Sequence, residues 1–259
     1  MKELLSGYHA LVCGASRGIG RATAHALATQ GASVTLLARD AEKLARLECE
    51  LPRLGSAQHH SLTADLDRTD TLPAQLDALR HPVHILVNNS GGPPGGPLLE
   101  ATPEQFRRAF ERLLIAAHLL TQAVVPDMRA AGYGRIINVI STSVREPIPG
   151  LGVSNTIRAA CAGWAKTLAR ELAPHGVTIN NILPGFTATA RLASLFSARA
   201  ADSGQPAAEV ETVARAGVPA GRFAQAEEIA AAIAFLAAPT AAYITGVSLP
   251  VDGGRLHGI

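Results

Sequence analysis

The glycine-rich run at residues 14–20 (GASRGIG) is the feature that most constrains the fold of this 259-residue chain. It directly follows the apolar run 9–13 (HALVC) and opens a stretch with helical spacing. Glycines allow a tight turn and let the backbone approach a phosphate, whose charge is favoured at a helix N-terminus. Glycines that merely form a turn would give the same pattern. If the turn binds a cofactor, the expected binding residues are Gly14, Ser16, Arg17, Gly18, Ile19 and Gly20.

Short apolar runs alternate with helical patterns along the whole chain. The expected strands cover residues 9–13, 33–38, 58–62, 83–88, 135–140, 177–183 and 247–251. The expected helices cover 18–30, 41–51, 69–79, 103–131, 154–173 and 226–238. This alternation predicts an α/β protein with a Rossmann-type, doubly wound, seven-stranded parallel sheet and right-handed crossovers. We expect one domain over residues 1–259, with a loop at 91–97 and a less regular insertion at 191–222.

Composition excludes several other classes of protein. A net charge of +2 with 47% apolar residues gives no indication of nucleic acid or an anionic membrane as a partner. No apolar run reaches membrane-spanning length, and the first residues lack a signal-peptide pattern. Cys13, Cys49 and Cys161 have no metal-binding or redox spacing, so we expect small buried thiols and no metal. These features predict a cytoplasmic protein that acts on a small molecule.

Several motifs in a fixed order resemble the short-chain dehydrogenase/reductase family. The turn has the family's G-x-x-x-G-x-G spacing, residues 87–91 (VNNSG) match its N-N-A-G stretch, and residues 180–189 (NNILPGFTAT) match N-x-x-x-P-G-x-x-x-T. Residues 243–246 and 251–254 match its C-terminal signature. The resemblance implies that Asp65 and Leu66 lie at the adenine, and that the segment after the sixth strand lies at the nicotinamide carboxamide. It implies these further cofactor-binding residues: Asn89, Ser90, Gly91, Pro184, Gly185, Thr187 and Thr189.

The residues after the second predicted strand indicate the choice of cofactor. A carboxylate there would bind the ribose hydroxyls of NAD and repel a 2′-phosphate. This chain instead has Ala38 followed by Arg39, and Arg17 lies within the glycine turn. Two guanidinium groups suit a phosphate, so we expect NADP(H) rather than NAD(H). The alternative is that Arg39 is a solvated charge paired with Asp40.

Residues 136–158 correspond to the stretch in which the family carries its catalytic serine, tyrosine and lysine. By this resemblance the serine is Ser141, the tyrosine position is Ser154 and the lysine position is Arg158. An asparagine position in the preceding long helix falls on Leu113. The resemblance thus implies a divergent member that keeps one of four catalytic positions. None of the three tyrosines is expected to reach this stretch: Tyr8 precedes the first strand, Tyr133 lies before the fifth strand at the end opposite the active site, and Tyr243 belongs to the C-terminal signature.

Ser154 and Arg158 are four residues apart, so both can share one helix face. We expect the side chain of Arg158 to retain the ribose contacts and positive charge of the missing lysine. A water held by Ser141 and Ser154 could relay a proton while Arg158 stabilises a developing oxyanion. The alternative is that both serines are structural helix caps. Arg145 and Glu146, in the following loop, are expected to form a surface pair.

Three functions are consistent with these residues. The first is an NADP(H)-dependent oxidoreductase acting on a carbonyl or alcohol through the atypical residues Ser141, Ser154 and Arg158. The second is a catalytically silent cofactor-binding protein that serves as a sensor or partner subunit. The third is an enzyme that reuses the pocket for isomerisation or elimination. The family resemblance also implies a homodimer or homotetramer, and residues 190–222 are expected to form a lid over the substrate.

Overall fold

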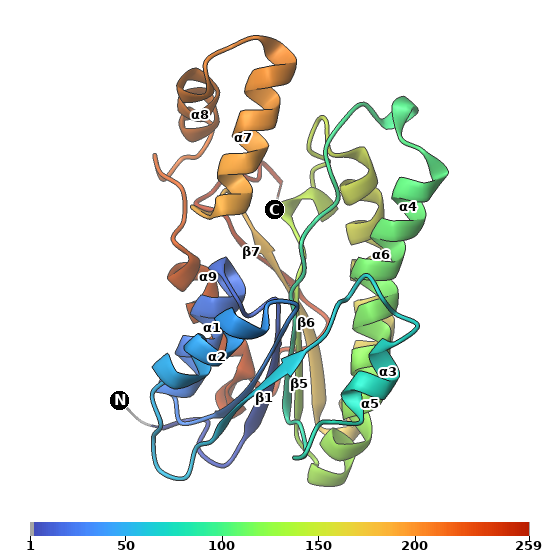
Figure 1. Cartoon of the computed structure of the whole chain (residues 1–259), viewed down its shortest axis with the longest axis vertical. Helices are drawn as coiled ribbons and strands as arrows, with labels where there is room; N and C mark the ends of the chain where they lie inside the picture. Colours follow the sequence, from blue (N-terminus) through green and yellow to red (C-terminus); the bar gives the residue numbers. More distant parts are fainter. Residues whose placement is uncertain (1–2, 259) are drawn as a thin grey trace.

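The computed structural model describes residues 3–258, except for the side chain of Asp202, and contains one seven-stranded sheet within that range (Figure 1). The strand order is β3-β2-β1-β4-β5-β6-β7, and every neighbouring pair is parallel. The strands are β1 His9–Cys13, β2 Ser33–Ala38, β3 His59–Thr63, β4 Ile85–Asn88, β5 Gly134–Val139, β6 Val177–Pro184 and β7 Ser248–Val251. The predicted Rossmann-type, doubly wound sheet in a single domain is confirmed.

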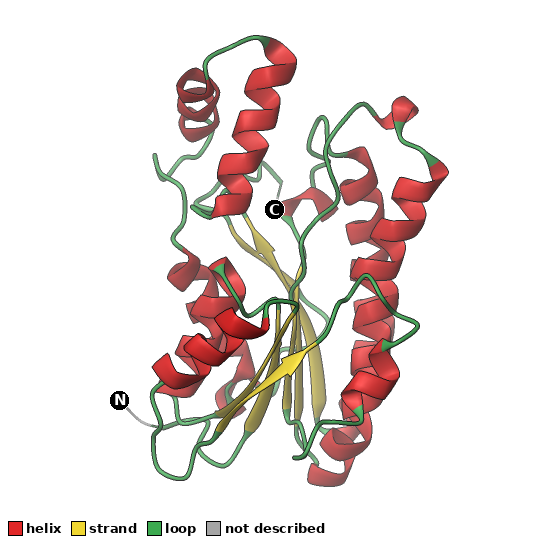
Figure 2. Ribbon diagram, in the orientation of Figure 1, coloured by secondary structure: helices red, strands yellow, loops and turns green. Residues whose placement is uncertain are grey.

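Helices cover both faces of the sheet (Figures 1 and 2). On one face lie α1 Gly18–Thr29, α2 Ala41–Glu50 and α9 Ala226–Ala237. On the other face lie α3 Leu72–Leu76, α5 Ala116–Ala131 and α6 Gly152–Leu172. Helix α4 Pro103–Phe110 precedes α5, while α7 Ala190–Ser203 and α8 Ala207–Ala216 project beyond one end of the sheet. None of these described helices combines the length and apolar character needed to cross a bilayer.

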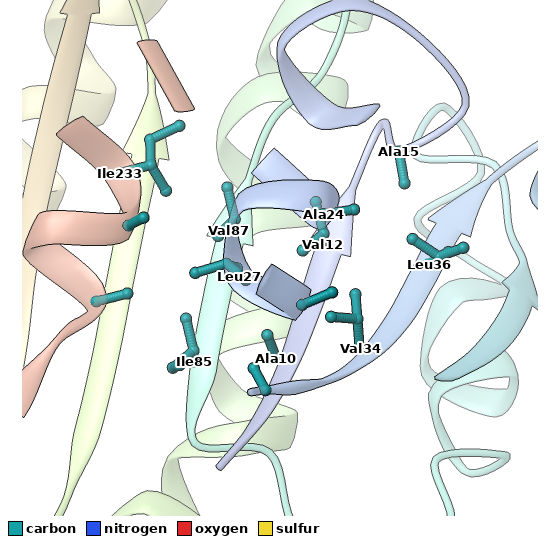
Figure 3. Close-up of a cluster of buried hydrophobic side chains, with 14 of the residues drawn as sticks. Ala10, Val12, Ala15, Ala24, Leu27, Val34, Leu36, Ile85, Val87 and Ile233 are labelled. Carbon is teal, nitrogen blue, oxygen red and sulfur yellow. The ribbon is translucent and has the colours of Figure 1, made fainter. Parts of the chain in front are cut away.

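The strands carry apolar side chains on both faces of the sheet, which explains why helices cover both faces. Figure 3 shows apolar side chains of the strands β1, β2 and β4 packed against those of two helices. The strand residues are Ala10, Val12, Val34, Leu36, Ile85 and Val87, and the helix residues are Ala24 and Leu27 of α1 and Ile233 of α9. Alternate residues such as Leu11 and Leu86 point to the opposite face and pack on α5 and α6. Burial on both faces requires the nearly continuous apolar runs seen in the sequence.

The connection between β6 and β7 departs from the expectation of right-handed crossovers. Helix α9 packs against α1, whereas α5 and α6, in the two preceding connections of the same direction, lie on the opposite face. The last crossover therefore has the opposite hand. Its path explains the exception, because α7 and α8 first carry the chain past the carboxyl ends of the strands before it descends on the α1 face (Figure 1).

Two helical segments differ from their predictions. The predicted helix 103–131 begins with the expected capping box of Thr102 and Gln105, but a π-helical segment, Glu111–Ile115, separates α4 from α5. Residues 191–222 were expected to be less regular, yet they contain most of α7 and all of α8. Alanine is the strongest helix former, and the buried pair Leu192 and Phe196 lies at i and i+4, the spacing of one helix face.

An amide ladder crosses the centre of the sheet. Asn88 Nδ2 donates to Asn138 Oδ1 at 2.9 Å, Asn138 Nδ2 donates to Asn181 Oδ1 at 2.9 Å, and Asn181 Nδ2 donates to Ser248 Oγ at 3.0 Å. These residues are paired neighbours in four consecutive strands, β4 to β7. The ladder satisfies polar groups that would otherwise be costly in a buried sheet.

The amino ends of the strands carry a group of aromatic and imidazole rings. Tyr8 stacks on Tyr133 with ring centroids 4.1 Å apart. Next to them, the buried His9 shares a 2.7 Å hydrogen bond between its Nε2 and Thr35 Oγ1, and its ring lies 5.7 Å from that of His81. Burial and, to a smaller extent, the neighbouring histidines lower the pKa of His9 to about 4. His9 is therefore neutral in the folded protein near neutral pH.

Candidate active site

The glycines of the turn at residues 14–20 pack so closely against neighbouring segments that a side chain at these positions would meet other atoms. A β-carbon on Gly14 would lie 2.6 Å from the Asn89 carbonyl oxygen, and Gly14 also has a positive φ of 61°. A β-carbon on Gly20 would lie 2.2 Å from the Gly14 carbonyl oxygen. On the other side, a β-carbon on Gly18 would lie 3.3 Å from Thr189 Cγ2. The structure therefore brings together the three motifs that lie after β1, β4 and β6.

The N-terminus of α1 fits an anionic group. Its N-cap residue, Arg17, makes no side-chain cap, and no acidic residue lies in the first helical turn. The first backbone N–H groups of the helix thus keep their capacity to bind phosphate. Arg17 itself is exposed, as is Arg39 at the end of β2. The backbone donors of this turn could therefore hold a phosphate group.

Arg39 does not pair with Asp40, contrary to the alternative drawn from the sequence. Asp40 caps α2, accepting from the Lys43 backbone N at 3.1 Å, and its side chain also pairs with Lys43. Arg39 Nη1 instead lies 4.0 Å from Asp65 Oδ2, in a pair whose side chains are 66% and 38% exposed. A pair of this length and exposure contributes little stability, so Arg39 can turn to a ligand at small cost.

Ser141 and Ser154 have different local roles. Ser141 follows β5, and its Oγ accepts a hydrogen bond from the Ser143 backbone N at 3.0 Å, which caps the 3₁₀ turn Thr142–Val144. The alternative that Ser154 caps its helix is wrong, because α6 begins at Gly152 with Leu151 as its N-cap. The Oγ of Ser154 instead accepts from Arg158 Nε at 3.1 Å.

Arg158 extends from α6 across the end of β5. Its Nη1 donates to the carbonyl oxygens of Ile140 at 2.7 Å and Val139 at 3.3 Å, immediately before Ser141. The residue is only 8% exposed, and it forms no ion pair with any carboxylate in the described part of the chain. Burial lowers the pKa of Arg158 to about 10, so the guanidinium remains charged at neutral pH. The structure thus brings Ser141, Ser154 and Arg158 to one point at the carboxyl edge.

A small cavity of about 20 Å³ adjoins this point and has room for one water molecule. Arg158, Asn138, Leu113 and Cys161 are among its lining residues. Leu113 lies in the π-helical segment, and its carbonyl oxygen accepts from Cys161 Sγ at 3.5 Å. Asn88 Oδ1, also from a lining residue, is buried with no hydrogen-bond partner in the described residues. A water molecule here would have polar groups to bind.

The three tyrosines lie at the amino ends of strands, away from Ser141. Tyr8 precedes β1, Tyr133 precedes β5 and donates to the Ala237 carbonyl oxygen at 2.6 Å, and Tyr243 precedes β7 with its side chain fully exposed. None of them reaches the carboxyl edge, where parallel strands place their functional loops. The sequence-based exclusion of these tyrosines is confirmed.

Two smaller predictions are wrong. Arg145 and Glu146 do not pair with each other: Arg145 donates to the Ser248 carbonyl oxygen at 3.1 Å, and Glu146 accepts from the His257 backbone N at 2.7 Å. These bonds attach the C-terminal segment and β7 to the loop that follows Ser141. Cys49 is exposed rather than buried, although Cys13 and Cys161 are buried as expected.

Sequence reasoning missed three arginines at the carboxyl edge. Arg191, in the first turn of α7, donates from Nη2 to the Pro93 carbonyl oxygen at 2.7 Å. Arg255 donates to Thr142 Oγ1 at 3.1 Å, and with Arg199 it lines a pocket of about 360 Å³. The position of Arg191, two residues after the P-G-x-x-x-T segment, was an available signal. No signal in the sequence marked Arg255 in the C-terminal tail, because only the tertiary fold brings this tail into contact with Thr142, the residue after Ser141.

Comparisons with known proteins agree along the whole chain. The family described as "Enoyl-(Acyl carrier protein) reductase" matches residues 14–255. The chain is 37% identical over 255 residues to the 3-oxoacyl-[acyl-carrier-protein] reductase of Vibrio cholerae, covering 96% of this chain and 98% of that protein.

Solved structures give the same result. The L-sorbose reductase of Gluconobacter frateurii, solved with NADPH and L-sorbose, superposes with a TM-score of 0.91 at 30% identity over 100% of each chain. A protein described as a short chain dehydrogenase/reductase family protein superposes with a TM-score of 0.82 at 32% identity, covering 96% of this chain and 97% of that one. The motifs, the fold and these likenesses together identify the chain as a member of the short-chain dehydrogenase/reductase family.

Proposed function

We propose that this protein is an NADP(H)-dependent oxidoreductase acting on a carbonyl or alcohol, with Ser154 and Arg158 where the family has its tyrosine and lysine. The observation that carries the proposal is the reach of Arg158 from α6 to Ser154 and to the last carbonyls of β5, next to Ser141. The relatives named above are reductases, and one was solved with NADPH and a sugar substrate, which supports the same chemistry here.

The cofactor's binding residues follow from the motifs that the fold brings together. The backbone of residues 14–20 would hold the diphosphate at the N-terminus of α1, while Arg17 and Arg39 would hold a 2′-phosphate. The adenine would lie at Asp65 and Leu66. The nicotinamide end would contact Asn89, Ser90, Gly91 and the residues after β6: Pro184, Gly185, Thr187 and Thr189. NADPH held there would supply a hydride to the carbonyl carbon of the substrate.

The protein's own residues must then supply a proton to the carbonyl oxygen and stabilise its negative charge. Arg158 is suited to the second task, because its guanidinium is charged, only 8% exposed and held in place by main-chain acceptors. A serine hydroxyl is a weak acid, so a water bound by Ser141 and Ser154 would relay the proton from solvent. This arrangement favours substrates that are already activated toward hydride.

The test is NADPH oxidation, followed by absorbance, with a panel of ketones, quinones and oxo acids. Turnover should fall in Ser141→Ala and Arg158→Ala and stay unchanged in Ser56→Ala and Arg46→Gln, which alter exposed residues outside the site and the proposed lid. NADPH binding without turnover across the panel would favour a cofactor-binding sensor or partner subunit. Conversion of a substrate with no NADPH consumed would favour isomerisation or elimination.

We further propose that residues 190–222, with α7 and α8, form the substrate lid, and that the protein is a homodimer or homotetramer. Helix α6 carries the small exposed residues Ala159 and Gly163, which suits close packing with a second copy. A monomer in light scattering would contradict the oligomer.

A further inference from the structure

Three polar side-chain ends converge on Gly92, in the loop after β4. A β-carbon on Gly92 would lie 3.2 Å from Arg158 Nη2, 3.7 Å from Arg191 Nη2 and 3.8 Å from Ser154 Oγ. The two arginines come from α6 and from the first turn of α7, which are far apart in sequence. Because residue 92 is glycine, it places no side chain of its own between these three groups.

Neither arginine has a counterion among the described residues. Arg158 donates only to Ser154 and to the carbonyls of Val139 and Ile140, while Arg191 donates to the carbonyl of Pro93. Arg112 adds a third guanidinium nearby. Asp67 already forms a bidentate ion pair with Arg112, so its carboxylate does not neutralise the other two arginines. Arg158 is buried, and an unpaired buried charge is costly, so a bound anion would remove that cost.

We infer that Arg158 and Arg191 bind a carboxylate of the substrate, so that the substrate is an oxo acid with its carboxylate close to the reacting carbonyl. The chemistry of reduction rests on the proposed function, whereas the anion site does not. A planar carboxylate has two oxygens and can accept from both guanidinium groups at once. Ser154 Oγ lies at the same point, which connects the bound carboxylate to the candidate proton path.

The cofactor's diphosphate is the other possible anion, and the sheet separates the two positions. The diphosphate belongs at the turn after β1, whereas Arg158 is held at the end of β5. Two strand spacings separate β1 from β5, with β4 between them, which amounts to roughly 10 Å. Arg191, however, follows Thr189, which lies against the glycine turn, so the experiment must distinguish the two sources.

Calorimetry on the NADPH-saturated protein provides the test, with pyruvate, 2-oxobutyrate, phenylpyruvate and 3-oxobutyrate as probes and their methyl esters as uncharged counterparts. We expect at least one acid to bind about tenfold or more tightly than its ester, equivalent to one charged hydrogen-bonding interaction. In Arg191→Gln that preference should fall below about threefold, with NADPH affinity unchanged. Arg191→Lys should retain part of the preference, and Arg46→Gln all of it.

Each contrary result has one meaning. Acids that bind no better than their esters, or that do not bind, would overturn the inference. Loss of NADPH affinity in Arg191→Gln, with no change in acid preference, would assign this guanidinium to the diphosphate and also overturn it. If acids are preferred but NADPH is never oxidised, the anion site stands and the oxidoreductase proposal fails. If neutral ketones are reduced with no acid preference, the oxidoreductase stands and the anion site fails.

Discussion

Arg158 Nε donates a hydrogen bond to Ser154 Oγ over 3.1 Å, between residues one helical turn apart in α6. This bond fixes the guanidinium so that its Nη1 meets two carbonyl oxygens at the end of β5. A helix face is thereby attached to the strand end that precedes Ser141, and the position of one charge depends on both elements.

We expect Arg158→Ala to lower the free energy of unfolding by about 1–3 kcal/mol, because buried acceptors lose their donor. NADPH-dependent turnover should fall by about tenfold or more. Arg158→Lys should recover more activity than stability, since a single amine retains the charge but cannot reproduce the fork of contacts. Urea denaturation and kcat/KM measure the two effects separately. Unchanged kcat/KM in Arg158→Ala would remove this residue from the mechanism.

The double variant Ser154→Tyr, Arg158→Lys would place the family's phenol and amine on the same helix face. We expect it to reduce unactivated ketones about a hundredfold faster than the original protein, as befits a general acid. Ser154→Phe, Arg158→Lys is the matched control, because it adds the ring but not the hydroxyl. Equal rates for the two double variants would show that the hydroxyl supplies no proton.

Arg39 has only a long, exposed contact with Asp65, so its removal should change cofactor binding far more than folding. We expect Arg39→Ala to weaken NADPH binding by about tenfold or more while leaving NADH binding nearly unchanged. Fluorescence titration with both cofactors measures this, with Arg46→Gln as the control for lost surface charge. Equal weakening of NADH would mean that Arg39 does not contact the 2′-phosphate.

Asn138 is bonded on both sides within the sheet, to Asn88 and to Asn181. Asn138→Ala should therefore leave two buried amide groups unpaired and cost about 2–4 kcal/mol in unfolding free energy. Thr121→Val is the matched control, because Thr121 Oγ1 is buried and has no hydrogen-bond partner in the described residues. That variant should be neutral or slightly stabilising. Similar losses in both variants would contradict the role of the ladder.

His9 should make the protein less stable in mild acid. Its folded pKa is about 4, below the ordinary value of 6.5, so the unfolded chain takes up the proton first. Its stabilising effect is complete above about pH 6.5 and is lost as the pH falls toward 4. The slope for one such group approaches about 1.4 kcal/mol per pH unit.

His9→Gln keeps a polar partner for Thr35 but cannot titrate. Urea denaturation at several pH values across this window should therefore give a flatter profile for the variant than for the original protein. His59 and His84, whose pKa values are also lowered by burial, should leave a smaller residual slope. Parallel profiles for the two proteins would show that His9 does not contribute.

The sequence was most informative where the local pattern alone determines structure. The apolar runs and the glycine turn predicted all seven strands to within about two residues, because strands covered on both faces leave a distinct signal. Thr102, Pro103 and Gln105 likewise marked the start of α4. The order of the motifs along the chain also predicted that the site lies at the carboxyl edge of the sheet.

Features that depend on contacts between distant segments could not be predicted. Nothing local to Ser154 shows that Arg158 Nε, rather than a backbone N–H, is its partner. The opposite hand of the β6–β7 crossover depends on the path through α7 and α8. The convergence of Arg158 and Arg191 on Gly92 requires three separate connections of the sheet to be in place.

The amide ladder from Asn88 to Ser248 also bears on how this sequence can change. Each member is hydrogen-bonded to the next, across four strands that come from widely separated parts of the chain. A single substitution is therefore penalised by neighbours that it does not alter, whereas concerted replacement by apolar residues of similar size would carry no such penalty. We expect substitutions at these four positions to be correlated among relatives.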